Sequence, residues 1–302
     1  MPGISEIFDW LADPWRLEFM RRGLIAVALV SIVAAVTGTF VILKGMAFIG
    51  DALPHASFGG VAAAFALGAN LYLGAAIAAI FTALLIGFIS RRAGVRYDTA
   101  IGITFVGAFA FGVLIVSRQS NYTVDLFSFV FGNVLGVGWD DLWLIGGVGA
   151  AVLILVALFY KELLFTAYDP TMAAASGLPV AAIQYGLLAL LALTTVIALQ
   201  AVGVVLVVAM LITPAATAQL LARRLPWMMA LGSLLGVLSS LIGLQIAFYA
   251  DVSASAAIVL TATGFFLATF ILAPERGLLW QPLVRQALGR VDREEPSTGG
   301  GV

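Results

Sequence analysis

The chain has 302 residues, of which 62% are hydrophobic and 10% are charged, and its formal net charge is −1 at pH 7. Soluble domains carry about 25% charged residues, so most of the surface of this protein must face lipid. A nucleic-acid-binding protein would carry a basic stripe, so no nucleic-acid partner is expected. The sequence has no cysteine, which excludes disulfides, thiolate metal sites and thiol chemistry.

Residues 1–22 predict an amphipathic segment at the membrane surface. They mix aromatic and leucine side chains with acids and bases, and Pro14 interrupts them. Such a composition is typical of a segment that lies at the interface rather than of a helix that crosses the bilayer. Nor do these residues show the basic start and apolar run of a cleavable signal peptide.

Apolar runs of about 20 residues, the length needed to cross the hydrocarbon core, recur between residues 23 and 274. They predict an all-α polytopic membrane protein with one transmembrane domain over 23–274. The stretch 122–141 is apolar but short and glycine-rich, and we interpret it as a re-entrant or surface segment rather than a tenth span. We expect nine spans, near residues 23–43, 46–67, 71–90, 98–117, 142–160, 181–201, 203–222, 228–249 and 254–274.

The Lys and Arg residues of short loops predict the orientation, because they favour the cytoplasmic side. With nine spans, most of them fall on one side, which also holds the C-terminal tail. This predicts a multi-pass protein of the bacterial inner membrane. Its C-terminus would lie in the cytoplasm, and its N-terminus, with residues 1–22, would lie outside. If 122–141 were counted as a span, the loops before it would change sides and the excess of Lys and Arg on one side would be lost. The excess therefore favours nine spans.

Two polar segments fall on the predicted cytoplasmic side. Residues 161–180 are too amphipathic to span, and alanine and methionine at helical spacing predict a short helix across the membrane surface. The tail 275–302 ends in EEPSTGGGV, a composition typical of disorder.

The span near 46–67 contains Asp51 and His55, and His55 is the only histidine of the chain. An ionisable residue at membrane depth is costly and by default indicates a functional site. The two residues are four apart, so on a helix they share one face. A carboxylate and an imidazole suit a borderline divalent ion such as manganese, iron or zinc. Two ligands are too few for a closed site, and a two-fold dimer with this helix at its axis would supply two Asp and two His.

Pro54 allows a second interpretation of this pair. Proline is tolerated in the first turn of a helix, so Asp51 could be an N-cap and His55 a satisfied polar residue inside the bundle. The two interpretations are compatible, because broken helices at membrane depth commonly line substrate sites. Pro214, inside a later span, is either a packing kink or a gate.

The sequence contains no phosphate-binding loop of the G-x-x-x-x-G-K-[ST] type, so the chain cannot hydrolyse a nucleotide by that route. No covalent chemistry and no permanently bound cofactor are therefore expected. A divalent ion would be cargo.

Four blocks, in order and at the expected spacing, carry a family resemblance. They are RLEFMRRGLIAVALVSIVAAVTGTFVILKGMAFIGDALPHASFGGVA, DLFSFVFGNVLGV, FTAYDPTMAAASGLPV and ALQAVGVVLVVAMLITPAATAQLLARR. From about residue 16 to 275 the chain resembles the permease subunits of manganese/zinc/iron ABC transporters, the ABC-3 family. One departure is Pro54, where the family more often has serine, and this puts the ligand geometry beside His55 in doubt.

The resemblance implies a type II ABC importer architecture similar to that of the vitamin B12 permeases. It implies a dimer of identical or different permease chains, two cytoplasmic ATPase subunits and an extracytoplasmic metal-binding protein. The membrane Asp and His of the family fall on Asp51 and His55. The family's coupling helix, which docks on the ATPase, falls on the block that contains Tyr168, Asp169, Pro170, Ala174 and Gly177.

Two functions remain open on the sequence. The first is the permease subunit of an ATP-driven divalent metal importer that works by alternating access, with manganese favoured over zinc or iron. The alternative is a stand-alone metal channel or secondary carrier, which would need no ATPase.

Overall fold

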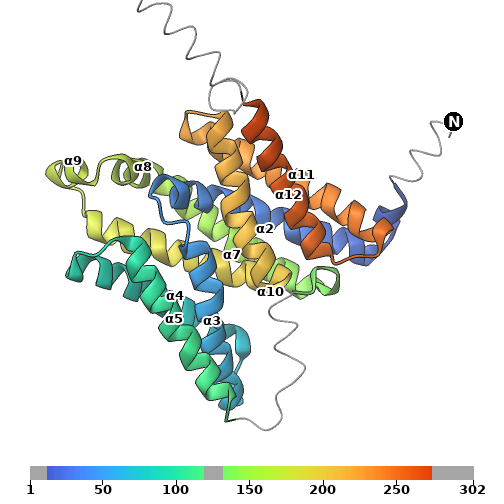
Figure 1. Ribbon diagram of the computed structural model, residues 1–302, viewed down its shortest axis with the longest axis horizontal. Helices are drawn as coiled ribbons and strands as arrows, with labels where there is room; N and C mark the ends of the chain where they lie inside the picture. The colour runs from blue at the N-terminus through green and yellow to red at the C-terminus, as the bar shows by residue number, and fades with distance from the viewer. Residues whose placement is uncertain (1–11, 119–131, 274–302) are drawn as a thin grey trace, which may run out of the picture.

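The computed structural model describes residues 12–118 and 132–273, and within these residues it contains helices and no strands. The predicted all-α fold is confirmed (Figure 1). In chain order the helices are η1 (Asp13–Arg16), α2 (Glu18–Leu43), α3 (Ile49–Ala66), α4 (Leu71–Ala93), α5 (Tyr97–Val116), η2 (Val134–Gly136), α7 (Trp139–Leu158), α8 (Tyr160–Tyr168), α9 (Pro170–Ala175), α10 (Val180–Leu221), α11 (Leu225–Ala250) and α12 (Ala254–Leu272).

The described residues include 8 helical segments that are long and apolar enough to cross a membrane. They correspond to all the predicted spans except 46–67, which is α3. This helix has 18 residues and carries Asp51, Pro54 and His55. It packs against α4, α5 and α10. The protein is therefore a multi-pass membrane protein.

Helix α10 contains two spans, 180–199 and 201–221, which meet at a kink. The chain changes direction at Gly203, whose φ of 77° and ψ of 170° are not helical. Only glycine adopts such a conformation readily. The sequence predicted two separate spans here, and the break at Gly203 confirms them.

Two hydrogen bonds join helices that are far apart in the chain. Trp139 Nε1 at the start of α7 donates to Glu18 at the start of α2 (3.3 Å), and the Ser255 hydroxyl of α12 donates to the Val202 carbonyl (3.4 Å). Of the segment 122–141, predicted to be re-entrant or at the surface, residues 122–131 lie outside the described residues.

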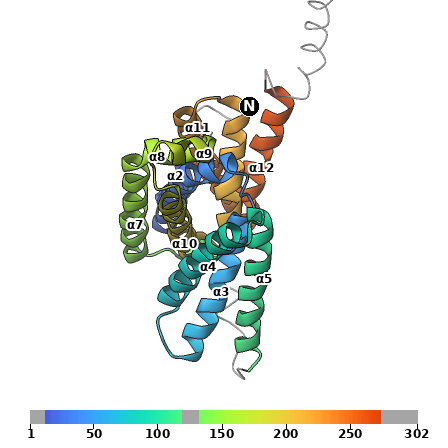
Figure 2. The ribbon, with the colours of Figure 1, turned by 90° about the vertical axis from the view of Figure 1, so that its left-hand side faces the viewer.

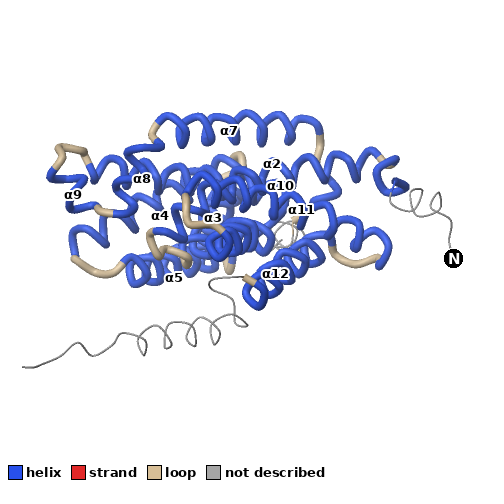
Figure 3. The backbone as a smooth tube through the Cα atoms, turned by 90° about the horizontal axis from the view of Figure 1, so that it is seen from above, coloured by secondary structure: helices blue, strands red, loops and turns tan. Residues whose placement is uncertain are grey.

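The core lies around α2, which packs against α10 and α11, while α7 lies along the outside of the bundle (Figure 3). Helices α3, α4 and α5 form a group beside this core (Figure 1, Figure 2). Buried hydroxyls mostly bond to carbonyls of their own helix, which satisfies them without water. Ser31 donates to the Val27 carbonyl at 2.6 Å and also meets Ser240 Oγ of α11 at 3.1 Å. Polar groups thus also join separate helices.

The two predicted terminal segments meet the described residues in part or not at all. Helix α2 begins at Glu18, before the predicted start of the first span at residue 23. It therefore takes in the end of the predicted 1–22 segment, of which residues 1–11 lie outside the described residues. The predicted tail 275–302 also lies outside them.

Candidate metal centre

Asp51 and His55 lie on one face of α3, as their spacing predicts. His55 Nε2 is 3.4 Å from Asp51 Oδ1. The Asp51 side chain is 49% exposed and that of His55 is 31% exposed, so both remain accessible on the single chain. The structure thus presents a carboxylate and an imidazole together on an open face of the helix.

The start of α3 explains how these residues are positioned. The helix begins at Ile49, and the N–H groups of Ile49, Gly50 and Asp51 donate to carbonyls three residues earlier, at 2.9 to 3.2 Å. Asp51 therefore lies in the first turn, where the positive end of the helix dipole stabilises a carboxylate. His55 follows one turn later.

Two expectations about Pro54 are wrong. The N-cap of α3 is Phe48 and not Asp51, and the helix is not broken at Pro54 but runs through it to Ala66. A proline ring clashes with the carbonyl four residues earlier, here that of Gly50. Because Gly50 is in the first turn, which already has three-residue spacing, little regular helix precedes the ring, and the helix tolerates it.

Phenylalanine rings of α5 form a wall beside His55. The ring centroid of His55 lies 5.5 Å from that of Phe105 and 5.8 Å from that of Phe109, the second in an edge-to-face arrangement (87°). Such pairs fix ring orientation and contribute about 0.5–1.5 kcal/mol beyond burial. Sequence reasoning missed these two residues. Their spacing of four indicates one face of α5, but nothing in the sequence shows that this face meets His55.

Within one chain the pair offers two possible ligands, too few to hold a metal ion. Among the described residues, no group of three or more His, Cys, Asp or Glu side chains could hold a metal ion. Divalent ions of this class take four or more ligands. The remaining ligands must therefore be water, backbone groups or residues from outside the described chain.

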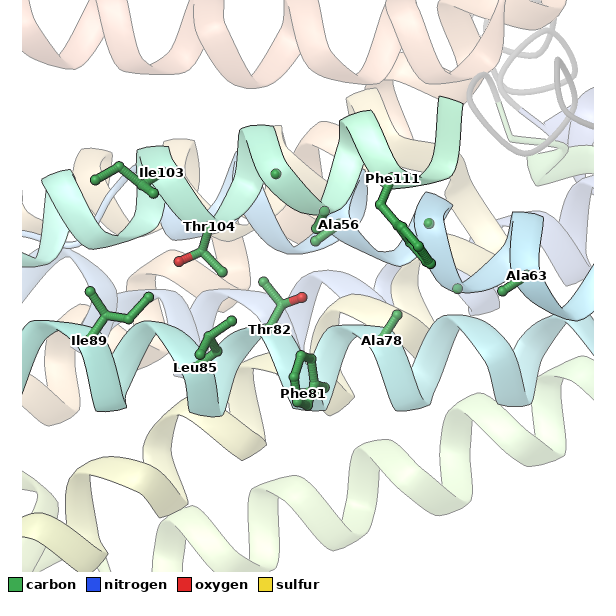
Figure 4. Close-up of a pocket in the computed structure, with 14 residues that line it drawn as sticks. Ala56, Ala63, Ala78, Phe81, Thr82, Leu85, Ile89, Ile103, Thr104 and Phe111 are labelled. Carbon is green, nitrogen blue, oxygen red and sulfur yellow. The ribbon is translucent and has the colours of Figure 1, made fainter. Parts of the chain in front are cut away.

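A cavity of about 450 Å³ lies between α3, α4 and α5, next to the pair but separate from it. Figure 4 shows Phe111 of α5 and Thr82 of α4 pointing into the gap between these helices. The lining contains only apolar side chains, glycines and the hydroxyls of Thr82 and Thr104, and the Thr104 hydroxyl already donates to the Ala100 carbonyl at 2.6 Å. It offers no carboxylate or imidazole, so it is not a metal site.

Comparison with known proteins identifies the family. The model of the ABC 3 transport family matches residues 16–273. This chain belongs to the ABC 3 transport family.

Similar family members have names that refer to metal transport. The chain is 45% identical to the manganese transport system membrane protein MntC of Halalkalibacterium halodurans, over 92% of this chain and 94% of the relative. It is 36% identical to the chelated iron transport system membrane protein YfeD of Yersinia pestis, over 89% and 90%. Among solved structures it is similar to PsaBC from Streptococcus pneumoniae in complex with Fab, with a TM-score of 0.79 and 41% identity over 94% of this chain and 100% of the other.

In this ABC 3 family chain the segment predicted as one surface helix, 161–180, is two short helices. Helices α8 and α9 meet at Asp169, whose Oδ1 accepts the Met172 N–H at 2.8 Å and caps α9. The five residues that the sequence resemblance assigns to a coupling helix are all exposed around this turn: Tyr168, Asp169, Pro170, Ala174 and Gly177.

The second proline of interest, Pro214, is buried inside α10, and the helix continues through it. It faces α11, because a Cβ built on Gly236 would lie 3.7 Å from the Pro214 ring. This contact favours a role in helix packing over a gate.

Proposed function

We propose that this chain is the membrane-spanning subunit of an ATP-driven importer of divalent metal ions, with manganese favoured over iron and zinc. The observation that carries the proposal is the Asp51–His55 pair, accessible on α3 and without a third ligand among the described residues. The names of the similar manganese transport proteins support the choice of metal. The cargo would pass this station without covalent chemistry.

A second permease chain, identical or different, would complete the site. Two copies of α3 facing each other across a two-fold axis supply two carboxylates and two imidazoles. Because most N- and O-donor sites bind zinc more tightly than manganese, selectivity must come from geometry and delivery rather than from the ligands alone. We assign delivery to an extracytoplasmic metal-binding protein.

Energy would come from two cytoplasmic ATPase subunits that dock on α8 and α9, since the exposed residues around Asp169 match the family's coupling helix. With the docking segment in the cytoplasm, the C-terminus would lie on the cytoplasmic side of the bacterial cell membrane and the N-terminus would lie outside. The excess of Lys and Arg on the same side as this segment supports that orientation.

Reconstitution in liposomes tests the proposal. The chain together with its ATPase subunits, ATP and loaded delivery protein should take up manganese, and the chain alone should not. Competition with iron and zinc, added at equal free concentration, then ranks the metals. Uptake by the chain alone, without ATP, would instead establish a channel or secondary carrier.

The cap at Asp169 gives a prediction for the docking surface. Asp169→Ala should weaken ATPase binding to the permease, because loss of a cap costs about 1 kcal/mol and α9 has only 6 residues to hold its shape. Asp169→Asn, which keeps an acceptor for the Met172 N–H, should bind close to normally. Copurification of the ATPase with each variant measures this; equal binding by Asp169→Ala and the native chain would contradict it.

A further inference from the structure

The turn between α2 and α3 contacts α8 through one charged side chain. Lys44 caps the C-terminus of α2, and its Nζ donates to the Thr166 carbonyl of α8 at 3.3 Å. Thr166 is buried, and its hydroxyl donates to the Leu163 carbonyl at 3.2 Å. A polar link thus connects the segment that leads into the metal pair with the segment matched to the coupling helix.

Lys44 forms no ion pair among the described residues. Its side chain is half-buried, and desolvation lowers the pKa of the ammonium below its ordinary value. Within the described residues its recorded bond is to a neutral carbonyl, and no carboxylate lies within ion-pair distance. The carbonyls at a helix C-terminus attract a cation, but more weakly than a carboxylate would.

Glu162 of α8 carries a carboxylate that forms no ion pair among the described residues. Its Oε2 is shielded from solvent and has no hydrogen-bond partner in the part of the chain that the structure describes. Glu162 precedes Thr166 by four residues, so the two share a face of α8 one turn, about 5.4 Å, apart. A shielded carboxylate oxygen without a partner is costly. Lys44, bonded at Thr166, and Glu162, one helical turn earlier on α8, thus both lack an ion-pair partner among the described residues.

We propose that Lys44 and Glu162 form an ion pair in a second state of the transport cycle, and that the exchange of Lys44 between the Thr166 carbonyl and Glu162 couples movement of α8 to the start of α3. This inference rests on the proposed function, in which the ATPases move α8 and α9. It makes both residues positioning residues, since neither touches the metal.

The packing around the turn would transmit a movement of Lys44 to Asp51. Gly45 has a φ of 63°, which reverses the chain directly after Lys44. Met46 and Ile49, which follow, are fully buried against the core. Met46 and Ile49 are therefore held by packing, and a displacement of Lys44 by one turn of α8 would shift the first turn of α3, which carries Asp51. One-turn shifts of packed elements are a known form of switching.

The test uses the complete complex with its ATPases in liposomes. Lys44→Met and Glu162→Gln should each lower metal uptake per ATP hydrolysed by about tenfold, a magnitude typical of coupling between sites, while equilibrium metal binding stays unchanged. The charge exchange Lys44→Glu with Glu162→Lys should restore part of the loss. Arg92→Met removes an exposed cation from α4, and it should transport normally. Lys44→Arg, which keeps a cationic donor, should retain most of the coupling.

Hydrogen exchange separates coupling from simple damage. In the native complex, ATP should change exchange both in residues 160–178 and in residues 46–55; in Glu162→Gln only the change in 160–178 should remain. The inference would be overturned if ATP still changed hydrogen exchange in residues 46–55 of the Glu162→Gln complex, or if this variant took up as much metal per ATP as the native complex. If Lys44→Met fails to accumulate, Glu162→Gln decides alone. Absence of ATP-driven uptake by the native complex would instead contradict the proposed function.

Discussion

Replacement of Asp51 or His55 should abolish metal uptake and leave the folded protein intact. We expect Asp51→Asn and His55→Ala each to lower uptake by about 100-fold or more, because loss of even an outer-shell partner of a metal typically costs about 10–100-fold in affinity. Asp51→Ala should behave in the same way as Asp51→Asn. Uptake of radioactive manganese into proteoliposomes that contain the complete complex measures the effect.

The fold should tolerate these changes because the pair contributes little to stability. Asp51 Oδ1 and His55 Nε2 are 3.4 Å apart, and both side chains are partly exposed. An ion pair in such surroundings is worth about 0–1 kcal/mol. Membrane insertion and copurification with the ATPase should therefore match those of the native chain. This separates loss of the metal station from loss of assembly.

Ser57→Ala is the matched control on the same helix. The Ser57 hydroxyl is buried and donates to the Leu53 carbonyl of its own helix at 2.8 Å, so it faces away from the pair. This variant should transport close to normally. Uptake near the native level in both Asp51→Asn and His55→Ala would show that the ion does not depend on this station.

The second large effect concerns stability and is expected at Gly38. Helices α2 and α10 approach so closely that a Cβ on Gly38 would overlap with the carbonyl oxygen of Leu211. The obstacle is backbone, so the helices would have to separate. Overpacking of this kind costs about 1–3 kcal/mol, and we expect Gly38→Ala to fall at the upper end of that range. The contact lies in the core around α2, where close approach through small residues is the main source of helix association in lipid.

Gly147→Ala provides the control for this prediction. Gly147 lies within α7, and a Cβ built on it meets nothing within 4 Å. Alanine in a helix interior is favoured over glycine by about 0.5–1 kcal/mol, so Gly147→Ala should be neutral or stabilising. Thermal unfolding in nanodiscs and the yield of monodisperse protein measure both variants. Equal stability of Gly38→Ala and Gly147→Ala would show that α2 and α10 are not in fixed contact.

The course of the chain through the membrane could be predicted from sequence because it depends on local composition. A run of apolar residues of sufficient length must span or be buried, wherever its neighbours lie. The spans of α2, α4, α5, α7, α10, α11 and α12 follow from this rule, and the division of α10 agrees with the helix break at Gly203. The shared face of Asp51 and His55 follows from helical periodicity alone.

Only the tertiary structure decided which helix faces meet. The wall of Phe105 and Phe109 beside His55, the contact of Gly38 with Leu211 and the link from Lys44 to Thr166 all join residues far apart in the chain. In apolar helices almost every face is suitable for lipid or for protein, so composition does not distinguish contact faces from free ones. The tolerance of α3 for Pro54 likewise depends on where the helix begins, and that is set by the turn before Ile49, anchored by the buried Met46 and Ile49, rather than by the proline itself.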